Sequence, residues 1–101
     1  MFEDLDFEKR VLLRKEIIRL SNQLDEQFAK ELELRNHCYL RIAYDNTVKN
    51  KWDIIVNRPF TKNATEEQLK NAVLLLKKYV TDKQLLFSHN DLSLGFREKF
   101  K

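Results

Sequence analysis

The sequence predicts a small all-α protein, and three observations support that fold class. Apolar residues recur at intervals of three and four over long stretches, as they do on one side of a helix. The 101 residues include one glycine and one proline, which is too few for the frequent turns of an all-β sandwich. Helix-capping residues precede the later apolar runs. We therefore expect one helical domain over residues 1–101, in which a long N-terminal helix packs on a capped second helix and a short third helix.

The first expected element is a long amphipathic helix that begins near residue 7, after Asp6, whose carboxylate can cap it. Ser21 and Asn22 are its weak point, because both side chains compete for backbone hydrogen bonds, and the helix can bend or restart there. A single helix over residues 7–48 would be about 60 Å long and would need a kink or a dimer partner. The sequence does not decide whether residues 7–48 form one helix or two. The apolar stripe of this stretch consists of Leu13, Ile17, Leu20, Leu24, Phe28 and Leu32.

The middle of the chain changes character after residue 34. Residues 35–48 keep helical spacing, and Asp45 stands four residues after Arg41 and four before Lys49, so it can form ion pairs with both. Residues 46–63 are less regular. There we expect a helix tail over residues 52–56, followed by a loop around Pro59.

The clearest helix signal is the capping box that starts at Thr65, whose hydroxyl can accept from the backbone of Gln68 while that side chain reaches back. Residues 81–84 repeat the capping pattern and open a shorter helix, and residues 96–101 form a basic tail that can fray. A homodimer is the alternative way to bury the N-terminal stripe. Within one chain, the stripe is expected to pack as an antiparallel hairpin or small bundle against Leu69, Val73, Leu76 and Val80.

The sequence carries no catalytic motif. A single glycine excludes a phosphate-binding loop and a dinucleotide-binding fingerprint, and the H-E-x-x-H, C-x-x-C and G-x-S-x-G spacings are absent. His37 and Cys38 are adjacent, so on a helix they point about 100° apart and do not face each other. Nothing fixes the distance between Asp45 and Asp53 that an acid–base pair would require. The sequence favours a non-enzymatic protein, and we expect no cofactor and no bound metal.

The ends and the hydropathy of the chain suggest where the protein resides. The N-terminal residues are acidic where a targeting segment would be basic, and no apolar run approaches the roughly 18 residues that span a membrane. The single cysteine fits a reducing compartment. We expect a cytoplasmic protein without a membrane span.

Positive charge gathers in the middle of the chain, and the candidate binding site lies there. Residues 1–34 carry a net charge of −3, residues 35–62 carry +4 and residues 63–101 carry +2. His37, Arg41 and Tyr44 would share one side of a helix, where guanidinium groups bind anions and aromatic rings stack on planar ligands. The structural alternative pairs Arg41 with Asp45 and places Tyr44 and Trp52 in the core. The candidate residues for an anion or a partner are Arg35, His37, Arg41, Tyr44, Asp45, Lys51, Trp52 and Arg58.

Three functions are compatible with this pattern. The leading hypothesis is a small non-enzymatic adaptor or regulatory protein that binds a partner protein through helical surfaces. The second is a nucleic-acid-binding regulator that uses the basic region from Arg35 to Lys62. The third is a small enzyme or ligand sensor with an anion site around Arg41. The salt dependence of binding separates the second from the first, because phosphate contacts give a steep slope.

Overall fold

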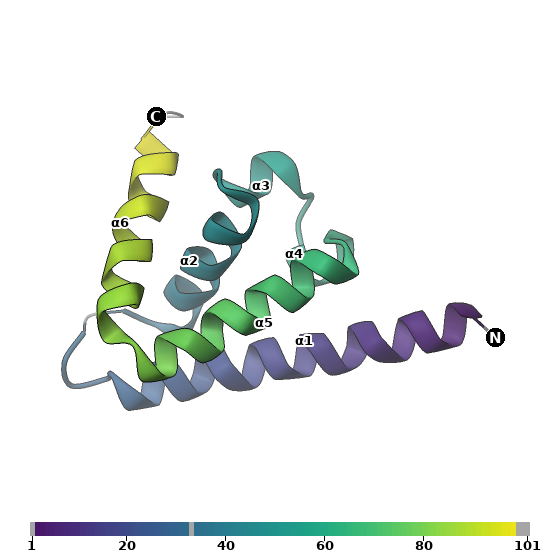
Figure 1. Ribbon diagram of the computed structural model, residues 1–101, viewed down its shortest axis with the longest axis horizontal. Helices are drawn as coiled ribbons and strands as arrows, with labels where there is room; N and C mark the ends of the chain where they lie inside the picture. Colours follow the sequence, from purple (N-terminus) through teal and green to yellow (C-terminus); the bar gives the residue numbers. More distant parts are fainter. Residues whose placement is uncertain (1, 33, 99–101) are drawn as a thin grey trace.

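The computed structural model of the chain describes residues 2–32 and 34–98, with the side chains of residues 7–32, 34–35 and 37–98. These residues form helices and contain no strand, which confirms the predicted fold class. Two of the helices are single turns. In chain order the elements are α1 (Phe2–Gln27), α2 (Asn36–Val48), α3 (Trp52–Ile55), α4 (Phe60–Asn63), α5 (Glu66–Thr81) and α6 (Lys83–Glu98), as drawn in Figure 1.

The long N-terminal helix continues through Ser21 and ends at Gln27, so residues 7–48 form two helices and the predicted restart at Ser21–Asn22 is wrong. Ser21 is buried, and its hydroxyl donates to the carbonyl of Ile18 (2.9 Å), which satisfies the side chain without ending the helix. The helical pattern gives way to a turn at Phe28, where the backbone N–H of Leu32 donates to the Phe28 carbonyl (2.9 Å). No glycine or proline marks this break in the sequence.

α1 packs along α5, as the two apolar faces predict. The helices run in the same direction, however, so the predicted antiparallel hairpin is wrong and the bundle alternative holds. Arg10 near the start of α1 donates to the carbonyl of Lys62 (2.8 Å), whereas Gln27 at its end donates to the carbonyl of Val80 (2.8 Å). The reason is that α2, α3 and α4 return the chain to the N-terminal side of α1 before α5 begins (Figure 1).

The predicted capping box at the start of α5 is confirmed. The Thr65 hydroxyl accepts from the backbone N–H of Gln68 (3.1 Å), and the Gln68 side-chain oxygen accepts from the backbone N–H of Thr65 (2.9 Å). The buried face of α5 lies against α1 and α2. It consists of Leu69, Ala72, Val73, Leu76 and Tyr79, while Val80 is half-buried at its end.

α6 is longer than the short helix that the sequence predicts, because residues 96–98, assigned to a fraying tail, belong to it. Residues 99–101 of that expected tail lie outside the described residues. The second capping signal is confirmed, but the acceptor differs: the carboxylate of Asp82, rather than the Thr81 hydroxyl, accepts from the backbone N–H of Leu85 (3.0 Å). α6 packs against α2 and α5.

α2 is the central helix, in contact with α1, α3, α5 and α6. Its buried side chains are Tyr39, Ile42, Ala43, Tyr44 and Asp45. α2 ends at Val48 and is followed by its cap Lys49, a non-glycine residue in the left-handed region (φ 57°). After this reversal, the helical stretch predicted at residues 52–56 forms the separate turn α3. Across the part of the chain that the structure describes, no helix is both long enough and apolar enough to cross a membrane.

Candidate functional site

A cavity of about 300 Å³ lies between α2, α3 and the last turns of α6. Five of the eight candidate residues line it, so the structure brings together most of the predicted site. Arg97 also lines the cavity, and the sequence did not point to it. We call this the arginine cavity, and its lining residues are His37, Leu40, Arg41, Tyr44, Trp52, Arg58 and Arg97.

The stripe predicted on α2 is present, because His37, Arg41 and Tyr44 all face the cavity. Tyr44 is also part of the core: its ring stacks on that of Phe60 (centroids 3.8 Å apart) and meets Trp52 edge-on (5.5 Å). Burial raises the pKa of the Tyr44 hydroxyl above its ordinary value of 10, so the group stays neutral. The aromatic residues therefore form a rigid wall of the cavity and fill the core at once.

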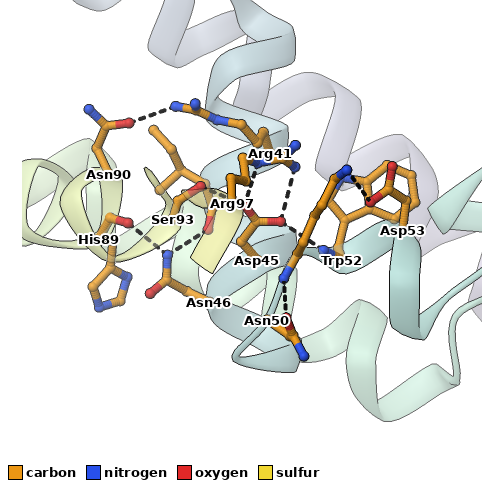
Figure 2. A network of polar contacts seen from close by, with 12 residues as sticks. Arg41, Asp45, Asn46, Asn50, Trp52, Asp53, His89, Asn90, Ser93 and Arg97 are labelled. Carbon is orange, nitrogen blue, oxygen red and sulfur yellow. Dashed lines mark hydrogen bonds and ion pairs between the residues drawn. The ribbon is translucent and has the colours of Figure 1, made fainter. Parts of the chain in front are cut away.

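Asp45 is fully buried and is the hub of a polar network between α2, α3 and α6 (Figure 2). Its carboxylate accepts from the backbone N–H of Trp52 (2.9 Å), from the hydroxyl of Ser93 (2.6 Å) and from Arg97, whose Nε and Nη2 donate at 2.8 and 3.1 Å. Four donors and an opposite charge offset much of the cost of burying a carboxylate. Asp45 thus fixes the start of α3 and the end of α6.

The ion pairs predicted for Asp45 with Arg41 and Lys49 are therefore wrong. The carboxylate lies on the face of α2 that packs against α6, where Arg97 reaches it, whereas Lys49 is exposed at the left-handed end of α2. The structural alternative predicted from the sequence is correct that Asp45 forms an ion pair within the chain, but the partner is Arg97 and not Arg41. Ser93 and Arg97 are four residues apart, so they share one side of the third helix once that helix continues into the stretch predicted as a tail.

Arg41 donates from Nη2 to the side-chain oxygen of Asn90 on α6 (2.6 Å). Its Nε is buried, and among the described residues it has no hydrogen-bond partner. No carboxylate in the described part of the chain forms an ion pair with it. Arg41 is consequently the one arginine of the cavity whose charge no described acidic side chain balances.

Arg58 lies over the ring of Trp52, with its guanidinium carbon 5.0 Å from the ring centroid, and donates to Asp53 (2.8 Å). Lys51 lies 4.0 Å from the other oxygen of the same carboxylate. Burial works to raise the pKa of Asp53, but the hydrogen bond from Arg58 and the charges of Lys51 and Arg58 outweigh it, so the pKa lies below its usual value. Asp53 is therefore a structural counterion, as Asp45 is. Arg58 pairs with Asp53, and Arg97 pairs with Asp45.

The remaining candidates lie apart from the cavity or beside it. Arg35, at the start of α2, lines a separate cavity of about 410 Å³ with Asp25, Ala29, Leu32 and Leu34. Lys51 precedes α3 and is not among the residues that line the arginine cavity, but its Nζ lies 4.0 Å from the carboxylate of Asp53, which Arg58 also contacts. The basic middle of the sequence is thus divided in space, and its charge does not form one continuous band.

Charge in and around the arginine cavity is unbalanced. Four cationic side chains (Arg41, Lys51, Arg58 and Arg97) lie in it or directly beside it, against the two carboxylates of Asp45 and Asp53. The net charge of these six side chains is therefore positive. Within the described residues, no group of three or more His, Cys, Asp or Glu side chains is placed to hold a metal ion.

No protein-family model, no curated protein sequence and no solved structure matches the chain.

Proposed function

We propose that this chain is a non-enzymatic binding protein that docks a partner protein on the side formed by α2, α3 and α6, with an acidic group of the partner in the arginine cavity. The observation that carries the proposal is the convergence of three arginines from three parts of the chain on one cavity. One of them, Arg41, has no carboxylate partner among the described residues.

The arrangement of the donors suits a carboxylate or a phosphate group. Guanidinium groups bind the oxygens of both through paired hydrogen bonds. Asp45 holds Arg97 through Nε and Nη2, and Asn90 engages Nη2 of Arg41. Among the described residues, no hydrogen bond engages Nη1 of either arginine, so this group can serve a ligand. Because these side chains are already held in place, a ligand would lose little free energy in ordering them.

The surroundings of the cavity favour a protein partner over a free ion. His37 and Arg58 at its edge are exposed, so the cavity is open to a side chain presented by another molecule. Ile54 and Ile55 lie on α3, two and three residues after Trp52, and are 50% and 52% exposed. Exposed apolar side chains next to a charged recognition point are typical of protein-binding surfaces, in which apolar contact supplies affinity and the charge supplies specificity.

The nucleic-acid alternative is less well supported by the same geometry. A phosphate backbone presents charges in a row, and a protein that binds it usually offers a matching stripe of cations. Here Arg35 lies at a separate cavity, and Lys51 and Arg58 share the carboxylate of Asp53. A single anionic group fits the arginine cavity better than a strand of phosphates does.

Trp52 supplies the test, because it is the only tryptophan of the chain and lines the cavity. Its fluorescence would be followed during titration with a short leucine-flanked glutamate peptide, its glutamine and phosphoserine counterparts, inorganic phosphate alone and a short single-stranded RNA. We expect saturable changes with the glutamate or the phosphoserine peptide, and binding at least about tenfold weaker with the glutamine peptide.

Two cavity variants and a control make the test specific. Arg41→Met and Arg58→Met should each weaken peptide binding by about tenfold or more, whereas Arg19→Met, on the exposed ion pair with Glu16, should leave it within about twofold. Arg58 is exposed, so its variant is expected to fold. Equal binding of glutamate and glutamine peptides would overturn the proposal. RNA binding with a steep salt dependence and no peptide binding would replace it with the nucleic-acid function.

A further inference from the structure

A second surface lies where the start of α1 extends past α5. α1 has 26 residues and is about 39 Å long, whereas α5 has 16 residues and is about 24 Å long. The start of α1 therefore projects beyond the helix that covers its apolar face (Figure 1). On this projecting part, Phe7 is 67% exposed and Leu12 is 66% exposed. Neighbouring exposed apolar side chains are a candidate contact surface, and both of these line one hollow.

Two adjoining hollows give this part of α1 a shape that a partner can enter. One, of about 290 Å³, is lined by Phe7, Glu8, Val11 and Leu12. The other has about 430 Å³ and lies between α1 and α4, lined by Phe7, Arg10, Val11, Arg14, Thr61 and Lys62. The two share Phe7 and Val11, so an apolar ridge separates them.

The larger hollow is basic and is held in a fixed shape. Its lining includes three cations, Arg10, Arg14 and Lys62, and no acidic side chain among the residues that the structure describes. Arg10 donates from Nη2 to the carbonyls of Thr61 (3.4 Å) and Lys62 (2.8 Å) and so joins α1 to α4. α4 in turn is anchored by Phe60, which is buried against Tyr44. The cations therefore stand next to the exposed apolar residues in a built arrangement.

We infer that this surface, which we call the α1–α4 surface (Phe7, Arg10, Val11, Leu12, Arg14 and Lys62), docks an acidic amphipathic helix of a partner protein. The apolar side of such a helix would cover Phe7, Val11 and Leu12, while its carboxylates would approach Arg14 and Lys62. Charge complementarity selects an acidic partner, because the described lining of the larger hollow carries three cations and no carboxylate, whereas the smaller hollow adds the single carboxylate of Glu8. A helix is the suitable form, because apolar residues on one helix pack into the hollows of another.

This surface shares no lining residue with the arginine cavity, so the inference stands or falls independently of the proposed function. Its test uses the whole chain and two synthetic helical peptides with the same leucine face, one with glutamates and one with lysines on the polar face. Binding would be measured by calorimetry. We expect the acidic peptide to bind at least about tenfold more tightly than the basic one.

Variants at exposed positions locate the contact. Phe7→Ser and Leu12→Ser should each weaken binding of the acidic peptide by about tenfold or more, and Arg14→Glu should abolish the preference for it. Leu74→Ser, at a comparably exposed leucine on α5, is the matched control and should change binding by less than about twofold. Arg58→Met in the arginine cavity should have no effect on this peptide.

Three results would overturn the inference. Equal affinity for the acidic and basic peptides would remove the charge argument. Self-association of the chain that Phe7→Ser abolishes would identify a second copy as the occupant. Binding to vesicles of phosphatidylserine and phosphatidylcholine that Phe7→Ser abolishes, without binding of the acidic peptide, would assign the surface to a membrane.

Discussion

Arg97 on α6 and Asp45 on α2 are 52 residues apart in the sequence, yet Nε of the arginine donates to the buried carboxylate at 2.8 Å. The pair joins the last turn of α6 to the central helix and places the guanidinium at the edge of the arginine cavity. The same contact therefore contributes to the stability of the fold and to the proposed binding site.

Replacing Asp45 with asparagine should strongly destabilise the protein. The substitution removes the charge that balances the guanidinium of Arg97, which is mostly buried. Removing one partner of a buried ion pair lowers the free energy of unfolding by about 3–5 kcal/mol. Urea unfolding followed by circular dichroism measures the change. The double variant with Arg97→Met should lose less than the sum of the two single losses, because each single change leaves a partner unpaired. Additive losses, or a loss below about 1 kcal/mol for the asparagine variant, would contradict this account of the pair.

The capping box of α5 should contribute measurably to stability. Thr65→Ala removes the oxygen that accepts from Gln68, and we expect the free energy of unfolding to fall by about 1 kcal/mol. Thr81→Ala is the matched control at the other end of the helix, where the hydroxyl makes a long contact (3.4 Å) to the Lys78 carbonyl. Equal losses for the two variants would show that the cap is not the cause.

Gly95→Ala should stabilise the protein. Gly95 lies within α6, where an added Cβ would meet no atom within 4 Å, so the methyl group fits without strain. Alanine in a helix lowers the entropy lost on folding, and we expect the free energy of unfolding to rise by about 0.5–1 kcal/mol. Ser93→Ala on the same helix should instead lower the free energy of unfolding, because the Ser93 hydroxyl donates to Asp45 at 2.6 Å. A destabilising Gly95→Ala substitution would contradict the open environment described for this position.

His89 should make stability depend on pH. Its Nδ1 lies 2.7 Å from the hydroxyl of the buried Tyr79, and burial, with a smaller effect of the Lys78 charge, lowers the pKa of the imidazole below its ordinary value of 6.5. The unfolded chain then binds the proton more readily than the folded one. Stability is therefore complete above about pH 6.5 and falls as the pH decreases through that value towards the lower folded-state pKa. Urea unfolding from about pH 7.5 to about pH 5.5 should show a decline that is smaller in His89→Gln, and identical slopes for the two proteins would exclude this residue as the cause.

The sequence predicted those features that depend on near neighbours. The Thr65 cap, the stripe of His37, Arg41 and Tyr44 and the helical turn at residues 52–56 each follow from residues fewer than eight positions apart, and all are present. Helical periodicity alone carries this information.

Features that depend on the path of the whole chain were beyond sequence reasoning. The parallel course of α1 and α5 results from the return of the chain through α3 and α4, which no local pattern specifies. The sequence places Arg97 in a tail, because its partner lies on another helix. It also predicts that Asp45 pairs with the cations four residues away, whereas the buried carboxylate pairs with Arg97. Tertiary burial decided both positions, since a buried carboxylate takes the donors that the packed elements bring to it.

The most direct test of the arginine cavity follows the side-chain Nε–H signals of the arginines by NMR while the leucine-flanked glutamate peptide is added. The account predicts that the signals of Arg41 and Arg58 shift and saturate together, while that of Arg19, which is paired with Glu16 on the exposed side of α1, stays in place. Equal shifts of all three, or a stationary Arg41 signal at saturating peptide, would contradict it.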